Sequence, residues 1–447
     1  MSTTSSRRAD PLPQRLLEQL RSLPEPRGYL VALSGGLDSM VLLHLMAALR
    51  SNLPAPLRAV HIHHGLHPDA DLWSRHCRER CAALSVPLTV CRVEVAAGPR
   101  RSLEAAAREA RYGAIGEILG EGEMLLLAHH GDDQVETFLL QLLRGAGVEG
   151  LAAMPPVRAW RRGWMARPLL GENRAGLRRW AEAQGIAWME DPGNADRRMA
   201  RNYLRHEVLP LLQRRWPGLE ATVGRSARHC AEAAQLLGEL AVLDLEKAGE
   251  SHPWRLGLEA LMRLSPARQR NLLRHWMRRN GVTPPPADVL ARVLRELPGA
   301  RRDAAPEVHW KGGALRRYRD RLYLFPGPLP PAPEKRVLHW RGDAPLRLPG
   351  GLGELRLEGA RPAWFPEAGV EVRFRHQGFR CRPAGREGSR SFKRLCQELG
   401  IPPWLRPRLP LVVVRGQLAA VADRVLCHPF GGGGESPFRW VRDPWLY

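Results

Sequence analysis

Residues 28–50 read GYLVALSGGLDSMVLLHLMAALR, and this stretch decides the fold of the N-terminal part of the chain. Its uncharged run at 29–33 is typical of a buried parallel strand, and the apolar run at 40–49 is typical of a helix. Between them, two adjacent glycines let backbone N–H groups face an anion, and the positive end of the helix dipole points to the same place. The stretch therefore predicts a phosphate-binding turn at 34–39.

The turn lacks the G-x-x-x-x-G-K-[ST] pattern of a Walker loop. Its pattern, Ser-Gly-Gly-x-Asp-Ser, resembles the PP-loop of ATP pyrophosphatases, which cleave ATP between the α and β phosphates. Because a carboxylate beside a phosphate is unfavourable unless a cation bridges them, we expect Mg²⁺ at Asp38. An alternative is a simple glycine turn whose helix is capped by Asp38 and Ser39. The residues expected to hold ATP at this turn are Ser34, Gly35, Gly36, Leu37, Asp38 and Ser39.

The chain has 447 residues, room for several domains, and a formal net charge of +22. Such an excess of positive charge predicts a polyanionic partner, most simply nucleic acid. The sequence has neither an apolar run long enough to cross a membrane nor an apolar signal core, so a cytoplasmic protein is expected. Its seven cysteines are an odd number without a C-x-x-C pair, which favours buried free thiols over a disulfide framework or a metal site.

Strands and helices alternate through the first 150 residues. The expected strands lie at 29–33, 57–63, 88–95 and 124–128. This alternation predicts an α/β fold with a doubly wound parallel sheet, in which ligands bind at the carboxyl ends of the strands. Three clusters of polar residues fall at such ends, at 34–39, 61–67 and 129–136. Their coincidence predicts one shared site.

The segment 158–216 carries thirteen arginines against six acidic residues, interleaved with tryptophans, and a weak strand is expected at 186–189. Either these side chains contact phosphates and stack on bases, or the tryptophans belong to the core and the arginines to a solvated face. The next segment, 218–325, reads as mostly helical, with helices near 222–248, 256–281 and 286–297 and a closing hairpin.

A proline-rich linker is expected at 326–333, followed by short strands and a helix at 391–400. This last part reads as a small α+β unit, and ten basic against three acidic residues over 371–410 suggest that it binds RNA. The expected domains are therefore a catalytic PP-loop domain at 1–216, a helical middle domain at 217–326 and a basic C-terminal domain at 335–447.

Several further stretches resemble one family, the tRNA(Ile)-lysidine synthases. They are HIHHGLHPDADLW after the second strand, EAAAREARY at 104–112, AHHGDDQVETFLLQLLRGAGVEGL at 128–151, RNYLRHEVLP at 201–210, and FRHQGFRCRP with SFKRLCQELGIPPWLRPRLPLVV near the C-terminus. The resemblance implies an enzyme that uses ATP and Mg²⁺ to adenylate C2 of the wobble cytidine in the isoleucine tRNA with a CAU anticodon. The ε-amine of free lysine then displaces AMP to give lysidine, and codon reading changes from AUG to AUA.

The resemblance also implies roles for individual residues. Asp38, Asp133 and Arg111 are expected to be catalytic, with Arg111 neutralising charge on phosphate unless it merely forms an ion pair on its helix. His63 is expected to border the adenine. Asp133 and Glu136, three residues apart on one helix face, suit a lysine ammonium, and one of them could accept its proton. Contacts to tRNA are expected from Arg201, Arg205, Arg380 and Lys393.

Three other functions compete with this interpretation. A PP-loop tRNA thiolation enzyme would need a reactive cysteine, and only Cys77 and Cys81 lie near the clusters. A non-catalytic RNA-binding protein would not need the intact Asp38, Asp133 and Glu136. A small-molecule ATP pyrophosphatase would not need the basic charge. A homodimer is compatible with the sequence, although no pattern demonstrates one.

Overall fold

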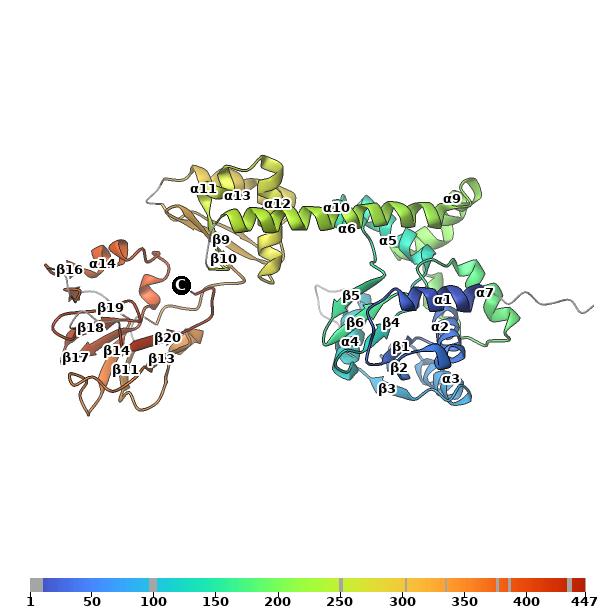
Figure 1. Ribbon diagram of the computed structural model, residues 1–447, viewed down its shortest axis with the longest axis horizontal. Helices are drawn as coiled ribbons and strands as arrows, with labels where there is room; N and C mark the ends of the chain where they lie inside the picture. Colours follow the sequence, from blue (N-terminus) through green and yellow to red (C-terminus); the bar gives the residue numbers. More distant parts are fainter. Residues whose placement is uncertain are drawn as a thin grey trace, which may run out of the picture. The chain divides into compact units, whose positions relative to one another are not determined.

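The structure is a computed structural model that describes residues 11–95, 103–248, 252–301, 304–333, 336–374, 378–384, 387–431 and 436–446. The chain divides into two units, Met1–Leu236 and Leu237–Tyr447 (Figure 1). None of the helices in these ranges is both long enough and apolar enough to cross a membrane.

The first unit is built on a six-stranded sheet with the order β3-β2-β1-β4-β6-β5. Its strands are β1 Tyr29–Leu33, β2 Leu57–His63, β3 Leu88–Arg92, β4 Met124–Leu126, β5 Val157–Trp160 and β6 Gly163–Ala166. All neighbours are parallel except β5 and β6, which form an antiparallel hairpin at the edge. The four expected strands are confirmed, whereas the β5–β6 hairpin was not predicted and 186–189 is not a strand.

Helices cover both faces of this sheet (Figure 1). They are α1 Pro11–Arg21, α2 Leu37–Ala48, α3 Ala70–Ala83, α4 Leu103–Ile118, α5 Gly131–Leu143, α6 Val148–Leu151 and α7 Arg174–Ala183. Side chains alternate along a strand, so Val31 packs in a core with α1, α2 and α7 while Leu30 packs against Ile115 of α4 on the other face. The predicted doubly wound α/β domain is confirmed.

The remainder of the first unit is helical. Its elements are α8 Ala200–Tyr203, a π-helix at Leu204–Val208 and α9 Leu209–Arg215, followed by α10 Leu219–Lys247, which runs on into the second unit. Short 3-10 turns lie at Arg50–Asn52 and Pro192–Ala195. Trp160, Trp164, Trp180 and Trp188 pack in or against the two cores, as the second of the two sequence interpretations expects, whereas Tyr203 and Trp216 are 52 and 55 % exposed.

The second unit begins with a four-stranded antiparallel sheet, β7-β10-β9-β8, and three helices after α10. These elements are β7 Arg255–Gly257, α11 Leu258–Met262, α12 Pro266–Arg279, α13 Ala287–Gly299, β8 Glu307–Trp310, β9 Gly313–Tyr318 and β10 Arg321–Phe325. The single helix expected at 256–281 is wrong, because α12 starts anew at Pro266, a residue suited to the first turn of a helix.

The C-terminal part of the chain has a five-stranded antiparallel sheet, β11-β14-β17-β18-β19, and two smaller sheets. Its strands and helix are β11 Val337–Trp340, β12 Leu346–Arg347, β13 Glu354–Leu357, β14 Val370–Arg373, β15 Arg380–Cys381, β16 Arg390–Ser391, α14 Phe392–Glu398, β17 Leu411–Val414, β18 Gln417–Val421, β19 Val425–Leu426 and β20 Phe438–Val441, with 3-10 turns at Pro349–Gly351 and Arg406–Arg408. The expected α+β character is confirmed.

Trp404 joins this part to the preceding sheet within one core. Its ring meets those of Tyr318, Tyr323 and Phe325 edge to face, at centroid distances of 6.1, 5.2 and 5.9 Å. The proline-rich segment 326–333 therefore connects two parts that share a core. The domain boundaries expected from sequence stay a prediction.

A disulfide links Cys381 of β15 to Cys427, with their Cα atoms 5.3 Å apart. The expectation of free thiols only is therefore wrong for this pair, whose 46-residue separation gives no signal in the sequence. The remaining cysteines, Cys77, Cys81, Cys91, Cys230 and Cys396, are free.

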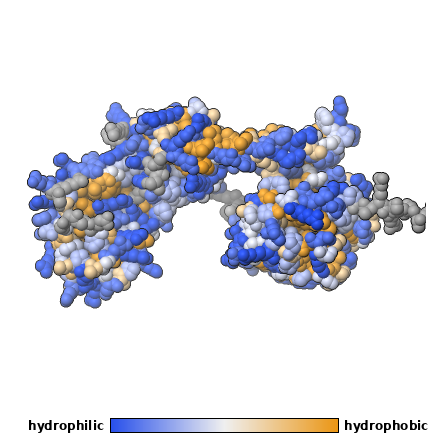
Figure 2. Space-filling view, in the orientation of Figure 1, coloured by the Kyte–Doolittle hydropathy of each residue, from blue (hydrophilic) through white to orange (hydrophobic). Residues whose placement is uncertain are grey.

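The surface in view is largely hydrophilic, but hydrophobic side chains gather along the middle of α10 (Figure 2). Leu236, Leu237 and Leu243 of this helix are 64, 39 and 53 % exposed. Large apolar side chains in such positions are a common mark of interaction surfaces.

Candidate active site

The turn after β1 has the geometry of an anion-binding loop. Gly35 has a φ of +88°, which favours glycine, and Gly36 is the cap residue of α2 without any side-chain hydrogen bond to the helix. The alternative in which Asp38 and Ser39 cap the helix is therefore wrong. Instead, the hydroxyls of Ser34 and Ser39 lie 3.1 Å apart and form a hydrogen bond within the loop.

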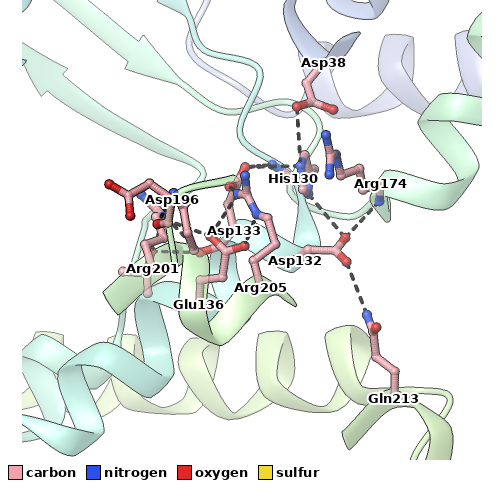
Figure 3. Close-up of polar contacts among 12 residues, drawn as sticks. Asp38, His130, Asp132, Asp133, Glu136, Arg174, Asp196, Arg201, Arg205 and Gln213 are labelled. Atoms are coloured by element: carbon pink, nitrogen blue, oxygen red, sulfur yellow. Dashed lines mark hydrogen bonds and ion pairs between the residues drawn. The ribbon is translucent and has the colours of Figure 1, made fainter. Parts of the chain in front are cut away.

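Asp38 projects from the first turn of α2 toward His130 at the end of β4 (Figure 3). Its Oδ2 lies 3.7 Å from Nε2 of His130, and its Oδ1 is buried without a hydrogen-bond partner. An orphaned carboxylate oxygen beside a glycine turn is a suitable ligand for a hard cation such as Mg²⁺, which usually takes one or two carboxylates together with substrate phosphates.

His130 lies among three carboxylates at the end of β4 (Figure 3). Its Nδ1 is 3.3 Å from Asp132, and its Nε2 is 3.4 Å from Asp133 and faces Asp38. Burial by itself lowers the pKa of His130, but the close contacts with the carboxylates of Asp132 and Asp38 and the charge of Asp133 outweigh it and raise the pKa to about 10. The imidazole is therefore a buried cation that holds three acidic side chains around it.

Asp132 of α5 forms hydrogen bonds with two other helices, α7 and α9. Its carboxylate accepts hydrogen bonds from the backbone N–H of Arg174 at the start of α7 (2.8 Å) and from the amide of Gln213 on α9 (3.3 Å). Burial raises the pKa of Asp132, but the contact with His130 and the hydrogen bond from the Arg174 backbone dominate and lower it to about 2. This carboxylate therefore acts as an anchor for His130. No pattern in the sequence predicts the contributions of Arg174 and Gln213.

Glu136 and Asp133 lie on the same face of α5, as their spacing predicts, and both meet arginines (Figure 3). Glu136 is fully buried and accepts hydrogen bonds from Nε of Arg201 at 2.7 Å and Nε of Arg205 at 2.6 Å. Arg205 also reaches Asp133 at 2.9 Å. The two arginines expected to contact tRNA are thus held by the two carboxylates expected to bind lysine, and both roles stay predictions.

His129 has the opposite character to its neighbour His130. Its Nδ1 is buried without a partner, and burial lowers its pKa to about 4 in spite of the charge of Asp133. The side chain is therefore a neutral imidazole at neutral pH. A neutral ring with an open nitrogen can accept a hydrogen bond from a substrate group.

The cluster at the end of β2 lies under α3 and α4. His63 is buried and its Nε2 is 3.2 Å from Asp71. The pKa of His64 is lowered by burial and then by the nearby charge of Arg111, which places this guanidinium within electrostatic reach of the cluster. The three strand-end clusters expected to share one site therefore all lie at the carboxyl edge of the sheet, and the ATP-contacting role of His63 and the catalytic role of Arg111 stay predictions.

Cys77 lies directly behind the glycine turn. A Cβ on Gly35 would meet its sulfur at 3.6 Å. Burial raises the pKa of this thiol to about 12, and that of Cys81 to about 11. Because the thiolate is the reactive form, neither cysteine is a nucleophile at neutral pH.

Arg380 of β15 and Lys393 of α14 belong to the second unit and are exposed. Arg380 donates hydrogen bonds to Ser389, and Arg394 beside Lys393 pairs with Glu398. These side chains form part of a basic surface whose contact with tRNA stays a prediction.

A glycine turn between a buried strand and a helix, with acidic clusters at the ends of neighbouring strands, defines a nucleotide-binding PP-loop domain, and residues 9–212 match the model of the PP-loop domain family. Residues 256–323 match the TilS substrate binding domain, and residues 370–440 match the TilS substrate C-terminal domain.

Curated relatives match nearly the whole chain. The tRNA(Ile)-lysidine synthase of Alkalilimnicola ehrlichii is 47 % identical over 92 % of this chain and 93 % of its own. The enzyme of the same name from Coxiella burnetii is 42 % identical over 95 and 94 %, and that from Methylococcus capsulatus is 43 % identical over 91 and 94 %. The chain therefore belongs to the tRNA(Ile)-lysidine synthase family.

Proposed function

We propose that this enzyme joins lysine to C2 of the wobble cytidine in the isoleucine tRNA with a CAU anticodon, with ATP converted to AMP and diphosphate. The proposal rests on one observation, which is that groups suited to bind phosphate and groups suited to bind an ammonium lie together in one site. An anion-binding turn with an orphaned carboxylate oxygen stands beside a buried pair of carboxylates suited to an ammonium group. Family membership supports the same reaction.

The first half of the reaction takes place at the turn. The backbone of Gly35 and Gly36 and the N-terminus of α2 bind the phosphates of ATP. Asp38 is the residue that would hold Mg²⁺. When bound, this ion neutralises charge on the phosphates. Arg111 adds positive charge from α4, and His63 borders the adenine.

The second half needs a neutral amine, because only the unprotonated ε-amino group of lysine is a nucleophile. Asp133 and Glu136 bind the ammonium, and one of them accepts its proton. The amine then attacks C2 of the adenylated cytidine, the C–N bond forms, and AMP leaves with the electron pair of the broken C–O bond. Arg201, Arg205, Arg380 and Lys393 hold the tRNA.

Two alternatives have less support. A thiolation enzyme of the same fold needs a reactive thiol, and the raised pKa values of Cys77 and Cys81 disfavour one at this turn. A non-catalytic RNA-binding protein has no need of a buried histidine with three acidic partners. A homodimer and a cytoplasmic location stay predictions; the exposed leucines of α10 support self-association.

The deciding experiment is incorporation of radiolabelled lysine into unmodified isoleucine tRNA with the CAU anticodon, in the presence of ATP and Mg²⁺. The methionine tRNA with the same anticodon is the control. We expect label in the first tRNA only. Absence of label in both tRNAs, with tRNA binding intact, would contradict the proposed reaction and leave an ATP-using enzyme with another nucleophile.

A further inference from the structure

The carboxylate of Glu136 has no room for a substrate ammonium in the arrangement seen here. It is fully buried, and its two oxygens accept three N–H groups from two arginines. Arg205 donates from Nε to Oε1 (2.6 Å) and from Nη2 to Oε2 (3.0 Å), while Arg201 donates from Nε to Oε2 (2.7 Å) (Figure 3). A lysine that binds Glu136 must therefore displace an arginine N–H group.

The charges around Glu136 favour an exchange. Arg201 and Arg205 both contact this carboxylate, whereas Asp133 is shared between Arg205 and His130. A further ammonium at Glu136 would lie close to two guanidinium groups and would be repelled by both. The exchange of one guanidinium for one ammonium avoids this repulsion and leaves the charge of the cluster unchanged.

The contacts indicate which arginine can leave. Arg205 has 20 % of its side chain exposed and binds both oxygens of Glu136 as well as Asp133. Arg201 is more exposed, at 34 %, and makes a single hydrogen bond to Glu136. Its other partners are uncharged, the hydroxyl of Thr137 at 3.0 Å and the carbonyl of Asp133 at 3.4 Å. Arg201 is therefore held less strongly by the carboxylates.

We propose that Arg201 occupies the position of the substrate ammonium while lysine is absent and that the ε-ammonium of lysine displaces it. The released guanidinium then binds a phosphate of the tRNA. The inference rests on the proposed function and concerns the order of events at the same site. It accounts for why a carboxylate expected to bind lysine and an arginine expected to bind tRNA are found bound to each other. Arg205 remains in place and positions Glu136.

Such an exchange couples the two substrates. A tRNA phosphate that draws Arg201 away exposes Glu136 and tightens lysine binding, and lysine tightens tRNA binding by the same factor. The coupling also protects the site, because Glu136 keeps a charged partner whenever lysine is absent. Couplings of this kind are usually about 5- to 150-fold, so an effect of about tenfold is expected.

The test measures binding in the intact chain without ATP, so that no reaction occurs. In the unsubstituted protein, saturating lysine should tighten tRNA binding about tenfold. In Arg201→Met, lysine alone should bind more tightly than in the unsubstituted protein, tRNA should bind more weakly, and the coupling should vanish. Arg198→Met is the matched control, because this nearby arginine is 90 % exposed and pairs with Asp196.

A purely structural salt bridge gives the opposite result. Lysine binding that is weaker or unchanged in Arg201→Met, or a coupling that survives, overturns the exchange. If Arg201→Met does not fold, Arg201→Gln is the second variant, and it must show the same tighter lysine binding. Failure of the unsubstituted protein to label tRNA with lysine would refute the proposed reaction, whereas labelling with an unchanged lysine affinity in the variant refutes only the exchange.

Discussion

The basic side chains expected to contact tRNA have different surroundings in the two units of the molecule. In the first unit, Arg201 and Arg205 reach inward to carboxylates that are buried or nearly so. In the second unit, Arg380 and Lys393 lie on the surface, and the neighbouring Arg394, 72 % exposed, has a partially exposed partner in Glu398. Arg201 and Arg205 therefore fix the geometry of the site, whereas Arg380 and Lys393 mainly contribute to the field that attracts a polyanion.

The difference shows that net charge alone does not locate a nucleic-acid surface. The segment 158–216 has the same net charge as the segment 371–410, but its arginines include the partners of the buried carboxylates Asp133 and Glu136. Substitutions of the site carboxylates in the first unit should therefore change the reaction itself, and those of Arg380 and Lys393 in the second unit should change mainly the binding of tRNA.

The largest effect is expected for Asp38→Ala. Loss of the carboxylate that would hold Mg²⁺ removes charge stabilisation of several kcal/mol, and about 4 kcal/mol corresponds to about a thousandfold lower rate. The measurement is the formation of AMP from ATP with tRNA and lysine present. Glu79→Ala, which removes an exposed carboxylate from α3, is the control. AMP formation at the normal rate in Asp38→Ala would show that this residue does not hold the metal.

Asp38 belongs to the part of the site that can be predicted from the sequence. Asp38, Asp133 and Glu136 were predicted as site residues because strand ends of a parallel sheet meet at one edge, so local patterns suffice to gather them. Their partners could not be predicted. Gln213 reaches Asp132 across 81 residues of sequence, and Arg205 reaches Glu136 across 69.

The elements that escaped prediction share the same cause. The β5–β6 hairpin consists of four-residue strands whose alternation is too short to read, and it is defined by pairing with β4. The disulfide joins Cys381 and Cys427, which come together only when the C-terminal sheets pack. Tertiary contacts decide these features, and local propensity does not encode them.

A moderate effect is expected from pH, through a histidine of the first unit. The pKa of His130 is raised to about 10 in the folded chain, above its ordinary value of 6.5. The stability it contributes is therefore fully present below about pH 6.5 and is lost as the pH rises through about 10. Asp132, whose pKa is lowered to about 2, loses its contribution only as the pH falls toward that value.

The measurement is the thermal melting temperature of the unsubstituted chain and of His130→Gln between pH 6 and 10, with a chelator present to remove divalent ions. The difference in melting temperature between the two proteins should be largest at pH 6 and should decrease toward pH 10. A difference that is constant across this range would mean that the imidazole is not a buried cation.

The smallest effect is expected for Arg380→Ala and Lys393→Ala in the second unit. Each substitution removes at most one phosphate contact, so tRNA binding should weaken only a few-fold, and the slope of log affinity against log salt should fall by about 0.7 to 0.9. The affinity for ATP should not change. Lys311→Ala, which removes an exposed lysine elsewhere in the same unit, is the control for a general loss of charge. A field distributed over the surface would respond equally to all three substitutions, so equal effects would mean that tRNA binding depends on the overall charge. A larger effect at Arg380 and Lys393 would define a specific tRNA surface on β15 and α14.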